Sequence, residues 1–252
     1  MTDPIILFPL LFCTGFIAGT IDAVAGGGGL ITLPVLLGAG FPPQLALGTN
    51  KFQSTFGSFT ASLYYWRNDN SLHRETKRIA LFTFLGALAG TIAVQQIDNA
   101  MLTYIIPFLL AGIFLYTLFS PSLGIKNKTP RMSVLLFGVI FGTSLGFYDG
   151  FFGPGTGSFW TFAFIFFLGL DITTSTGKTK ILNFVSNIVS LAVFLWKGSV
   201  WFLAGIVMAS GQILGARYGA KLVINNGTKF IRPVFLTMVF FTIVKVVWIT
   251  FF

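Results

Sequence analysis

Ten apolar runs follow one another along the chain, separated by short polar or glycine-rich connections. They lie at about 5–25, 30–40, 44–66, 79–96, 101–119, 131–151, 157–170, 178–196, 200–216 and 230–252. Most are close to the roughly 20 residues that a helix needs to cross a bilayer. The pattern predicts an all-α polytopic membrane protein with eight to ten helical segments. Because no Lys or Arg precedes the first run, we expect 5–25 to be kept as a membrane helix rather than cleaved as a signal peptide.

Charged residues are scarce, and they gather between the apolar runs. Only 9% of the residues are charged and 54% are hydrophobic, whereas roughly 25% are charged in a soluble domain. The net charge of +9 does not indicate nucleic acid as a partner, because the basic residues lie in short loops, as membrane topology requires. The single cysteine, Cys13, lies inside an apolar run, and the single histidine, His73, lies in a basic loop. We therefore expect no metal site, no cofactor and no enzyme activity.

The two halves of the chain repeat each other. A shift of 127 residues without a gap superposes seven pairs of identical residues: Gly15/Gly142, Gly19/Gly146, Asp22/Asp149, Gly26/Gly153, Gly28/Gly155, Thr49/Thr176 and Lys51/Lys178. Chance does not align two aspartates, several glycines and a lysine in one register. We expect a first membrane repeat over 1–120, a second over 131–252 and a cytoplasmic linker over 121–130.

The positive charges orient these repeats. Three connections hold 11 of the 16 basic residues: Arg67, Arg74, Lys77 and Arg78; Lys126, Lys128 and Arg131; and Arg217, Lys221, Lys229 and Arg232. Basic loops stay in the cytoplasm, so each half must cross the membrane an odd number of times. The repeats are therefore predicted to be inverted, with both termini outside, as in many secondary transporters. Two topologies remain open: ten crossings, or six crossings plus two re-entrant hairpins.

Each repeat contains a break in its apolar pattern, next to an aspartate. The breaks are Asp22-Ala-Val-Ala-Gly-Gly-Gly-Gly29 and Asp149-Gly-Phe-Phe-Gly-Pro-Gly-Thr-Gly157. Each glycine weakens a helix by roughly 1 kcal/mol relative to alanine, and unwound backbone at membrane depth must be buried or line a wet cavity. Because the N–H groups of a restarting helix attract anions, we predict that substrate binds at Gly26, Gly27, Gly28, Gly29, Gly153, Gly155 and Gly157. The alternative is a pair of tight turns that need glycine only for their shape.

Polar side chains follow both breaks, in helices that begin near residues 44 and 171. We predict that Asn50, Lys51, Gln53, Lys180 and Asn183 bind substrate. An aspartate at the bilayer centre costs roughly 2.5–3.5 kcal/mol, so Asp22 and Asp149 are expected to pair with buried cations, balancing charge or relaying protons. The alternatives are lysines whose ammonium groups reach the nearer interface, and aspartates that cap helices.

These motifs resemble a known family. Gly15-Phe-Ile-Ala-Gly-Thr-Ile-Asp-Ala-Val-Ala-Gly-Gly-Gly-Gly29 and Ala46-Leu-Gly-Thr-Asn-Lys51 resemble the TauE/SafE family of sulfite exporters, and Gly146-Phe-Tyr-Asp-Gly-Phe-Phe-Gly-Pro-Gly-Thr-Gly157 with Lys180-Ile-Leu-Asn183 is similar to its YfcA-like branch. The resemblance implies transport of sulfite, sulfonates or related small anions across the bacterial inner membrane. We expect a secondary transporter that works by alternating access, with protons as a candidate coupling ion. The alternative is an anion channel of the same architecture.

Overall fold

The computed structural model describes residues 4–68, 73–106, 108–109 and 129–226. The described elements are α1 (Pro4–Ala25), α2 (Gly29–Gly38), α3 (Pro43–Asn68), α4 (His73–Gln95), α6 (Val134–Phe137), η2 (Gly138–Gly142), α7 (Thr143–Phe151), α8 (Thr156–Phe167), α9 (Ile172–Trp196) and α10 (Phe202–Asn226). Residues 99–106 are also helical. Four stretches are long and apolar enough to cross a membrane: Pro4–Ala25, Thr76–Gln95, Val134–Phe151 and Ile172–Trp196. The predicted all-α polytopic membrane fold is confirmed.

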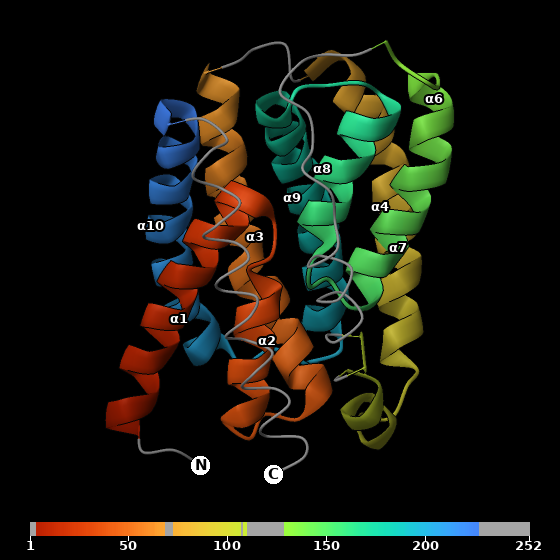
Figure 1. Cartoon of the computed structure of the whole chain (residues 1–252). Helices are drawn as coiled ribbons and strands as arrows, with labels where there is room; N and C mark the ends of the chain where they lie inside the picture. The colour runs from red at the N-terminus through yellow and green to blue at the C-terminus, as the bar shows by residue number, and fades with distance from the viewer. Residues whose placement is uncertain (1–3, 69–72, 107, 110–128, 227–252) are drawn as a thin grey trace.

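The first two helices form a hairpin. α1 runs from one face of the molecule into its interior, and α2 returns to the same face (Figure 1). The chain reverses direction at Gly26, whose φ of 75° lies in the left-handed region that favours glycine. With only 10 residues, α2 is about 15 Å long, half the thickness of a bilayer core. α2 therefore begins inside the molecule, where α1 ends.

The second half builds the same hairpin from the opposite face. α6, η2 and α7 form one continuous helix with a π-helical turn in it, and α8 returns (Figure 1). The N–H of Arg131 donates to the carbonyl of Phe167 at 2.8 Å, which ties the two outer ends of the hairpin together. The hairpin tips meet: Ser158 donates through its N–H to the Gly26 carbonyl at 3.1 Å and through its hydroxyl to the Ala25 carbonyl at 2.9 Å.

The hairpins favour one of the two topologies for the described part of the chain. α3, α4, α9 and α10 each run from one face to the other (Figure 1). Together with the hairpins, they match the arrangement of six crossings and two re-entrant segments. The two other crossings that this arrangement needs fall on the runs 101–119 and 230–252, of which only 101–106 and 108–109 are described.

The two halves are interleaved rather than separate. α1 packs along α10, α4 along α7, and α3 against α9, so the hairpin of each half lies on a helix of the other. Glycines allow this close approach, as in many membrane helix pairs. Gly15 and Gly19 of α1 face the backbone of α10, while Gly86 and Gly90 of α4 face that of α7.

The described basic segments share one face. The start of α4, the start of α6 and the end of α10 all lie at the end opposite to the start of α1 (Figure 1). These segments carry Lys77, Arg78, Arg131, Arg217 and Lys221, as the positive-inside rule predicts for a cytoplasmic face. The described residues do not include four further basic residues: Lys126, Lys128, Lys229 and Arg232. They also do not include 121–128 of the predicted linker, or residues 1–3 and 227–252 at the two termini.

Substituting an interface glycine tests this packing. A methyl group at Gly90 would overlap the backbone of Phe147, whereas one at Gly38 would meet no atom within 4 Å. We expect Gly90→Ala to lower the free energy of unfolding by about 1–3 kcal/mol, as overpacking does. Thermal unfolding in detergent measures the effect, with Gly38→Ala as the matched control. Equal melting temperatures for the two variants would contradict the close contact of α4 with α7.

Candidate functional site

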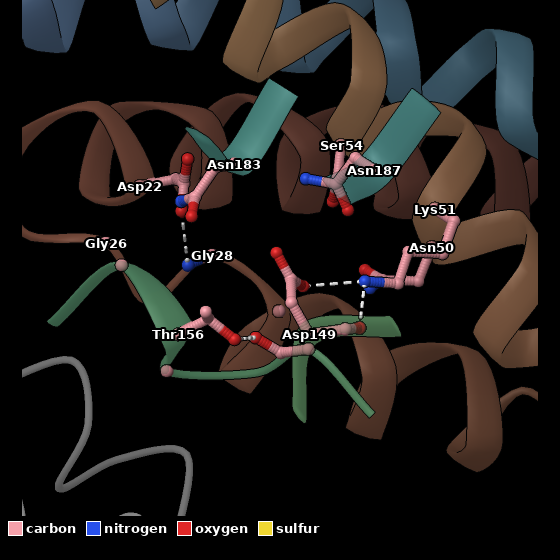
Figure 2. A pocket seen from close by; sticks show the side chains of 14 residues that line it. Asp22, Gly26, Gly28, Asn50, Lys51, Ser54, Asp149, Thr156, Asn183 and Asn187 are labelled. Carbon is pink, nitrogen blue, oxygen red and sulfur yellow. Dashed lines mark hydrogen bonds and ion pairs between the residues drawn. The ribbon is translucent and has the colours of Figure 1, made fainter. Parts of the chain in front are cut away.

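A cavity lies where the two hairpin tips meet (Figure 2). Its empty volume is about 350 Å³, counted with the open space at its mouth. The lining residues are Asp22, Gly26, Gly28, Gly29, Asn50, Lys51, Ser54, Asp149, Gly153, Gly155, Thr156, Gly157, Asn183 and Asn187. All the predicted site residues are among them except Gly27, Gln53 and Lys180. The structure thus gathers both breaks and both polar helices around one space, while substrate binding there stays a prediction.

Glycines shape the walls of the cavity. Gly153 and Gly155 have φ values of 101° and 81°, which L side chains rarely adopt. Gly26 and Gly157 touch: a Cβ on either residue would lie 2.5 Å from the Cα of the other. The helices α2 and α8 therefore restart beside each other, and both present their N-termini to the cavity.

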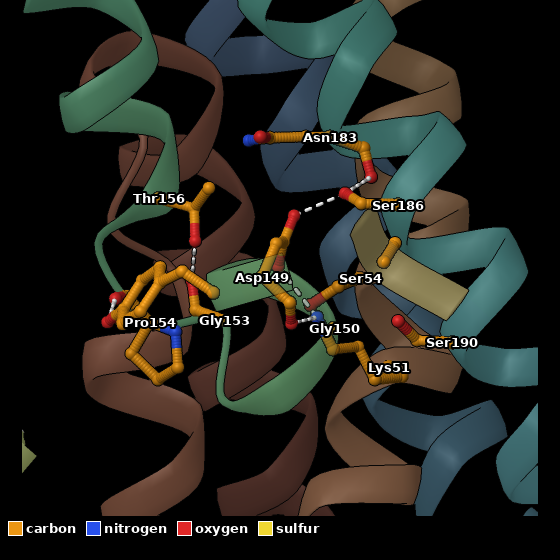
Figure 3. A network of polar contacts seen from close by, with 12 residues as sticks. Lys51, Ser54, Asp149, Gly150, Gly153, Pro154, Thr156, Asn183, Ser186 and Ser190 are labelled. Atoms are coloured by element: carbon orange, nitrogen blue, oxygen red, sulfur yellow. Dashed lines mark hydrogen bonds and ion pairs between the residues drawn. The ribbon is translucent and has the colours of Figure 1, made fainter. Parts of the chain in front are cut away.

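A buried ion pair joins the first half to the second. The Nζ of Lys51 on α3 lies 2.7 Å from Oδ1 of Asp149 on α7, and it also donates to the main-chain carbonyl of Asp149 (Figure 3). The other carboxylate oxygen accepts from the hydroxyl of Ser186 on α9. The two charged side chains are only 1% and 4% exposed. Both carboxylate oxygens of Asp149 therefore accept hydrogen bonds from side chains of the protein.

A second ion pair crosses between the halves in the opposite sense. The Nζ of Lys180 on α9 lies 3.3 Å from Oδ2 of Asp22 on α1, and it donates to the Asp22 carbonyl. The N–H of Gly28 reaches the other carboxylate oxygen at 3.4 Å (Figure 2). Lys180 is fully buried, whereas the Asp22 side chain is 18% exposed and lines the cavity. The expected pairing of both aspartates with buried cations is present, and each pair joins different halves.

The ion pairs correct the alignment of the repeats. The ungapped shift of 127 residues placed Lys51 opposite Lys178, but Lys180 is the residue that repeats the role of Lys51. α3 begins at Pro43 and α9 at Ile172, 129 residues later, because α8 has 12 residues where α2 has 10. Lys178 is buried with contacts of its own and does not line the cavity.

The amide oxygen of Asn50 is held by two neighbours. This oxygen accepts from the Thr32 hydroxyl at 2.5 Å and from the Gln53 amide at 2.9 Å. The amide nitrogen of Asn50 lines the cavity side of α3 and donates to no residue that the structure describes. Gln53 lies behind this wall, where it also donates to the Ser54 hydroxyl at 3.0 Å. Gln53 does not line the cavity, and its contact with substrate stays a prediction.

Further polar groups complete the cavity. The oxygen of the Asn183 amide is buried and has no hydrogen-bond partner among the described residues. Thr156, which the sequence interpretation passed over, donates to the Gly153 carbonyl at 2.6 Å. The position of Thr156 inside the second break could have indicated that this residue lines the cavity. In the described ranges, no group of three metal-ligating side chains comes together.

Comparison with known proteins places the chain. A cavity between two inverted hairpins, inside a bundle of apolar helices, defines a class of membrane transporter. The chain belongs to the TauE/SafE family, whose model, described as sulfite exporter TauE/SafE, matches residues 11–246. It is 46% identical to a probable membrane transporter protein of Haemophilus influenzae, over 96% of this chain and 95% of the relative. It is 42% identical to the probable membrane transporter protein YfcA of Escherichia coli, over 92% and 86%. No solved structure matches the chain.

Breaking the tighter ion pair tests its role in the fold. Asp149→Leu leaves the Lys51 ammonium buried without its counter-ion, which lowers the free energy of unfolding by about 3–5 kcal/mol in comparable pairs. We expect Lys51→Met in the same chain to restore much of this loss, because it removes the unpaired charge. Thermal unfolding of both single variants and the double variant in detergent measures the coupling. Additive effects would show that the two side chains do not stabilise each other.

Proposed function

We propose that this protein is a secondary transporter of a small anion, with sulfite, a sulfonate or a related organosulfur or carboxylate anion as substrate, in the inner membrane of a bacterium. The observation that carries this proposal is the polar cavity at the meeting point of the two inverted hairpins. Family membership supports the class of protein, and the chemistry of the cavity supports the sign of the substrate's charge.

The cavity offers hydrogen-bond donors to an anion from several sides. Asn50 presents its amide nitrogen, and the N-termini of α2 and α8 carry partial positive charge. Lys51 brings an ammonium group to the same wall. Oxyanions such as sulfite accept several hydrogen bonds at once, so donors that converge from different helices suit them.

The inverted hairpins support alternating access. Each hairpin enters from a different face, and the two tips touch through Gly26 and Gly157 at the cavity. When two inverted repeats exchange conformations, a site between them changes the side to which it is open. A substrate held at the tips would then be carried across by movement of the hairpins rather than through a continuous pore.

Flux into proteoliposomes tests the proposal. Asn50→Leu keeps the approximate size of the side chain but removes its amide, that is, the N–H donor and the oxygen that accepts from Thr32 and Gln53. A hydrogen bond to a charged group contributes about 1.5–3 kcal/mol. We expect sulfite flux to fall roughly ten- to hundredfold. Lys51→Ala should abolish flux, whereas Lys197→Ala, which removes an exposed lysine after α9, should not change it.

The same vesicles separate a transporter from an anion channel. A transporter driven by a pH or anion gradient accumulates labelled sulfite above its external concentration, and single-channel currents are absent. Flux that never runs uphill, together with unitary currents, would replace the transporter with a channel. Wild-type flux in both Asn50→Leu and Lys51→Ala would overturn the assignment of the site.

A further inference from the structure

The two ion pairs at the cavity are related by the repeat, but their surroundings differ. Asp149 has both carboxylate oxygens held at short range by Lys51 and Ser186. Asp22 has only long contacts, 3.3 Å to Lys180 and 3.4 Å to the Gly28 N–H. Its side chain is also the more exposed, at 18% against 4%. Of the two carboxylates, Asp22 therefore has the spare acceptor capacity.

The charge of the site is balanced before substrate arrives. Lys51 and Asp149 cancel, and so do Lys180 and Asp22. A monoanion bound beside Asn50 and Lys51 would add an uncompensated negative charge deep in the protein, where water screens it poorly. Binding therefore favours any change that removes one negative charge from the cavity wall.

We propose that Asp22 takes up one proton when the anion binds, so that anion and proton occupy the site together. The proton is released by buffer acid in the bulk solvent, reaches the site through the open mouth of the cavity and forms an O–H bond on the Asp22 carboxylate. The Lys180 ammonium then loses its counter-ion, and its positive charge balances the bound anion. Asp149 keeps its contacts, because Lys51 and Ser186 hold both of its oxygens. This inference rests on the proposed function and names its coupling ion and coupling group.

Among the described residues, few ionisable groups lie around Asp22 that could take up the proton in its place. Lys180 faces it from α9, and Tyr65 approaches from α3, where its hydroxyl donates to the Ala23 carbonyl at 3.0 Å. α2 and α8 carry no ionisable side chain. On α10, Arg217 and Lys221 are exposed. Lys180 is therefore the charged group that responds directly to protonation of Asp22.

Calorimetry in buffers of different protonation enthalpy counts the protons taken up per bound sulfite. Sulfite itself titrates near neutrality, so the wild type is compared with Asp22→Asn at the same pH, and the contribution of the substrate cancels. We expect the wild type to take up as much as one proton more per anion. The ratio of its Kd to that of Asp22→Asn should rise about tenfold per pH unit as the pH increases.

Asp98→Asn is the matched control, because it makes the same change in an exposed loop carboxylate. It should keep the proton count of the wild type. Where Asp22→Asn does not fold, difference infrared spectroscopy of the wild type gives the answer, since sulfite should produce a new protonated-carboxyl band. Equal proton counts in the wild type and Asp22→Asn, or no such band, would overturn the inference alone. A wild type that binds none of sulfite, thiosulfate and ethanesulfonate would overturn the proposed function as well.

Discussion

The crossed pairing of charges between the two halves is the constraint on which the rest of the structure depends. Each half places one aspartate at its helix break and one lysine on the helix that follows, and neither finds its partner within its own half. A buried charge without a partner is strongly destabilising, so the halves must meet in the one register that pairs Lys51 with Asp149 and Lys180 with Asp22. That register also brings the glycine breaks together, and the cavity between the hairpin tips results from it.

Much of this arrangement was predictable, because its causes are local in the sequence. Apolar runs of membrane length predict membrane helices, and basic loops predict the cytoplasmic face. Glycines and a proline beside Asp22 and Asp149 indicate where helices must stop, whatever surrounds them. Most residues chosen on these grounds do line the cavity. Membership of the TauE/SafE family agrees with the resemblance that the same motifs suggested.

What could not be predicted depends on distances that sequence spacing does not encode. An ungapped alignment places Lys51 opposite Lys178, because it cannot account for the two residues by which α8 is longer than α2. Gln53 and Asn50 share a polar stripe, and only side-chain packing shows that one supports the other. Charge parity permits ten crossings as readily as six with two hairpins. The hydrogen bond from Arg131 to Phe167, which joins the outer ends of one hairpin, is the type of observation that distinguishes them.

The interleaving of the halves has a consequence for the origin of the protein. α1 packs along α10 and α4 along α7, so the apolar face of each hairpin is covered by a helix from the other half. A single repeat would have exposed that face and left Asp22 without a cation. An ancestral gene that encoded one repeat could have built this cavity only as a pair of copies inserted in opposite orientations. The covalent link between the repeats holds one copy in each orientation, and the two aspartates have different surroundings in the present chain.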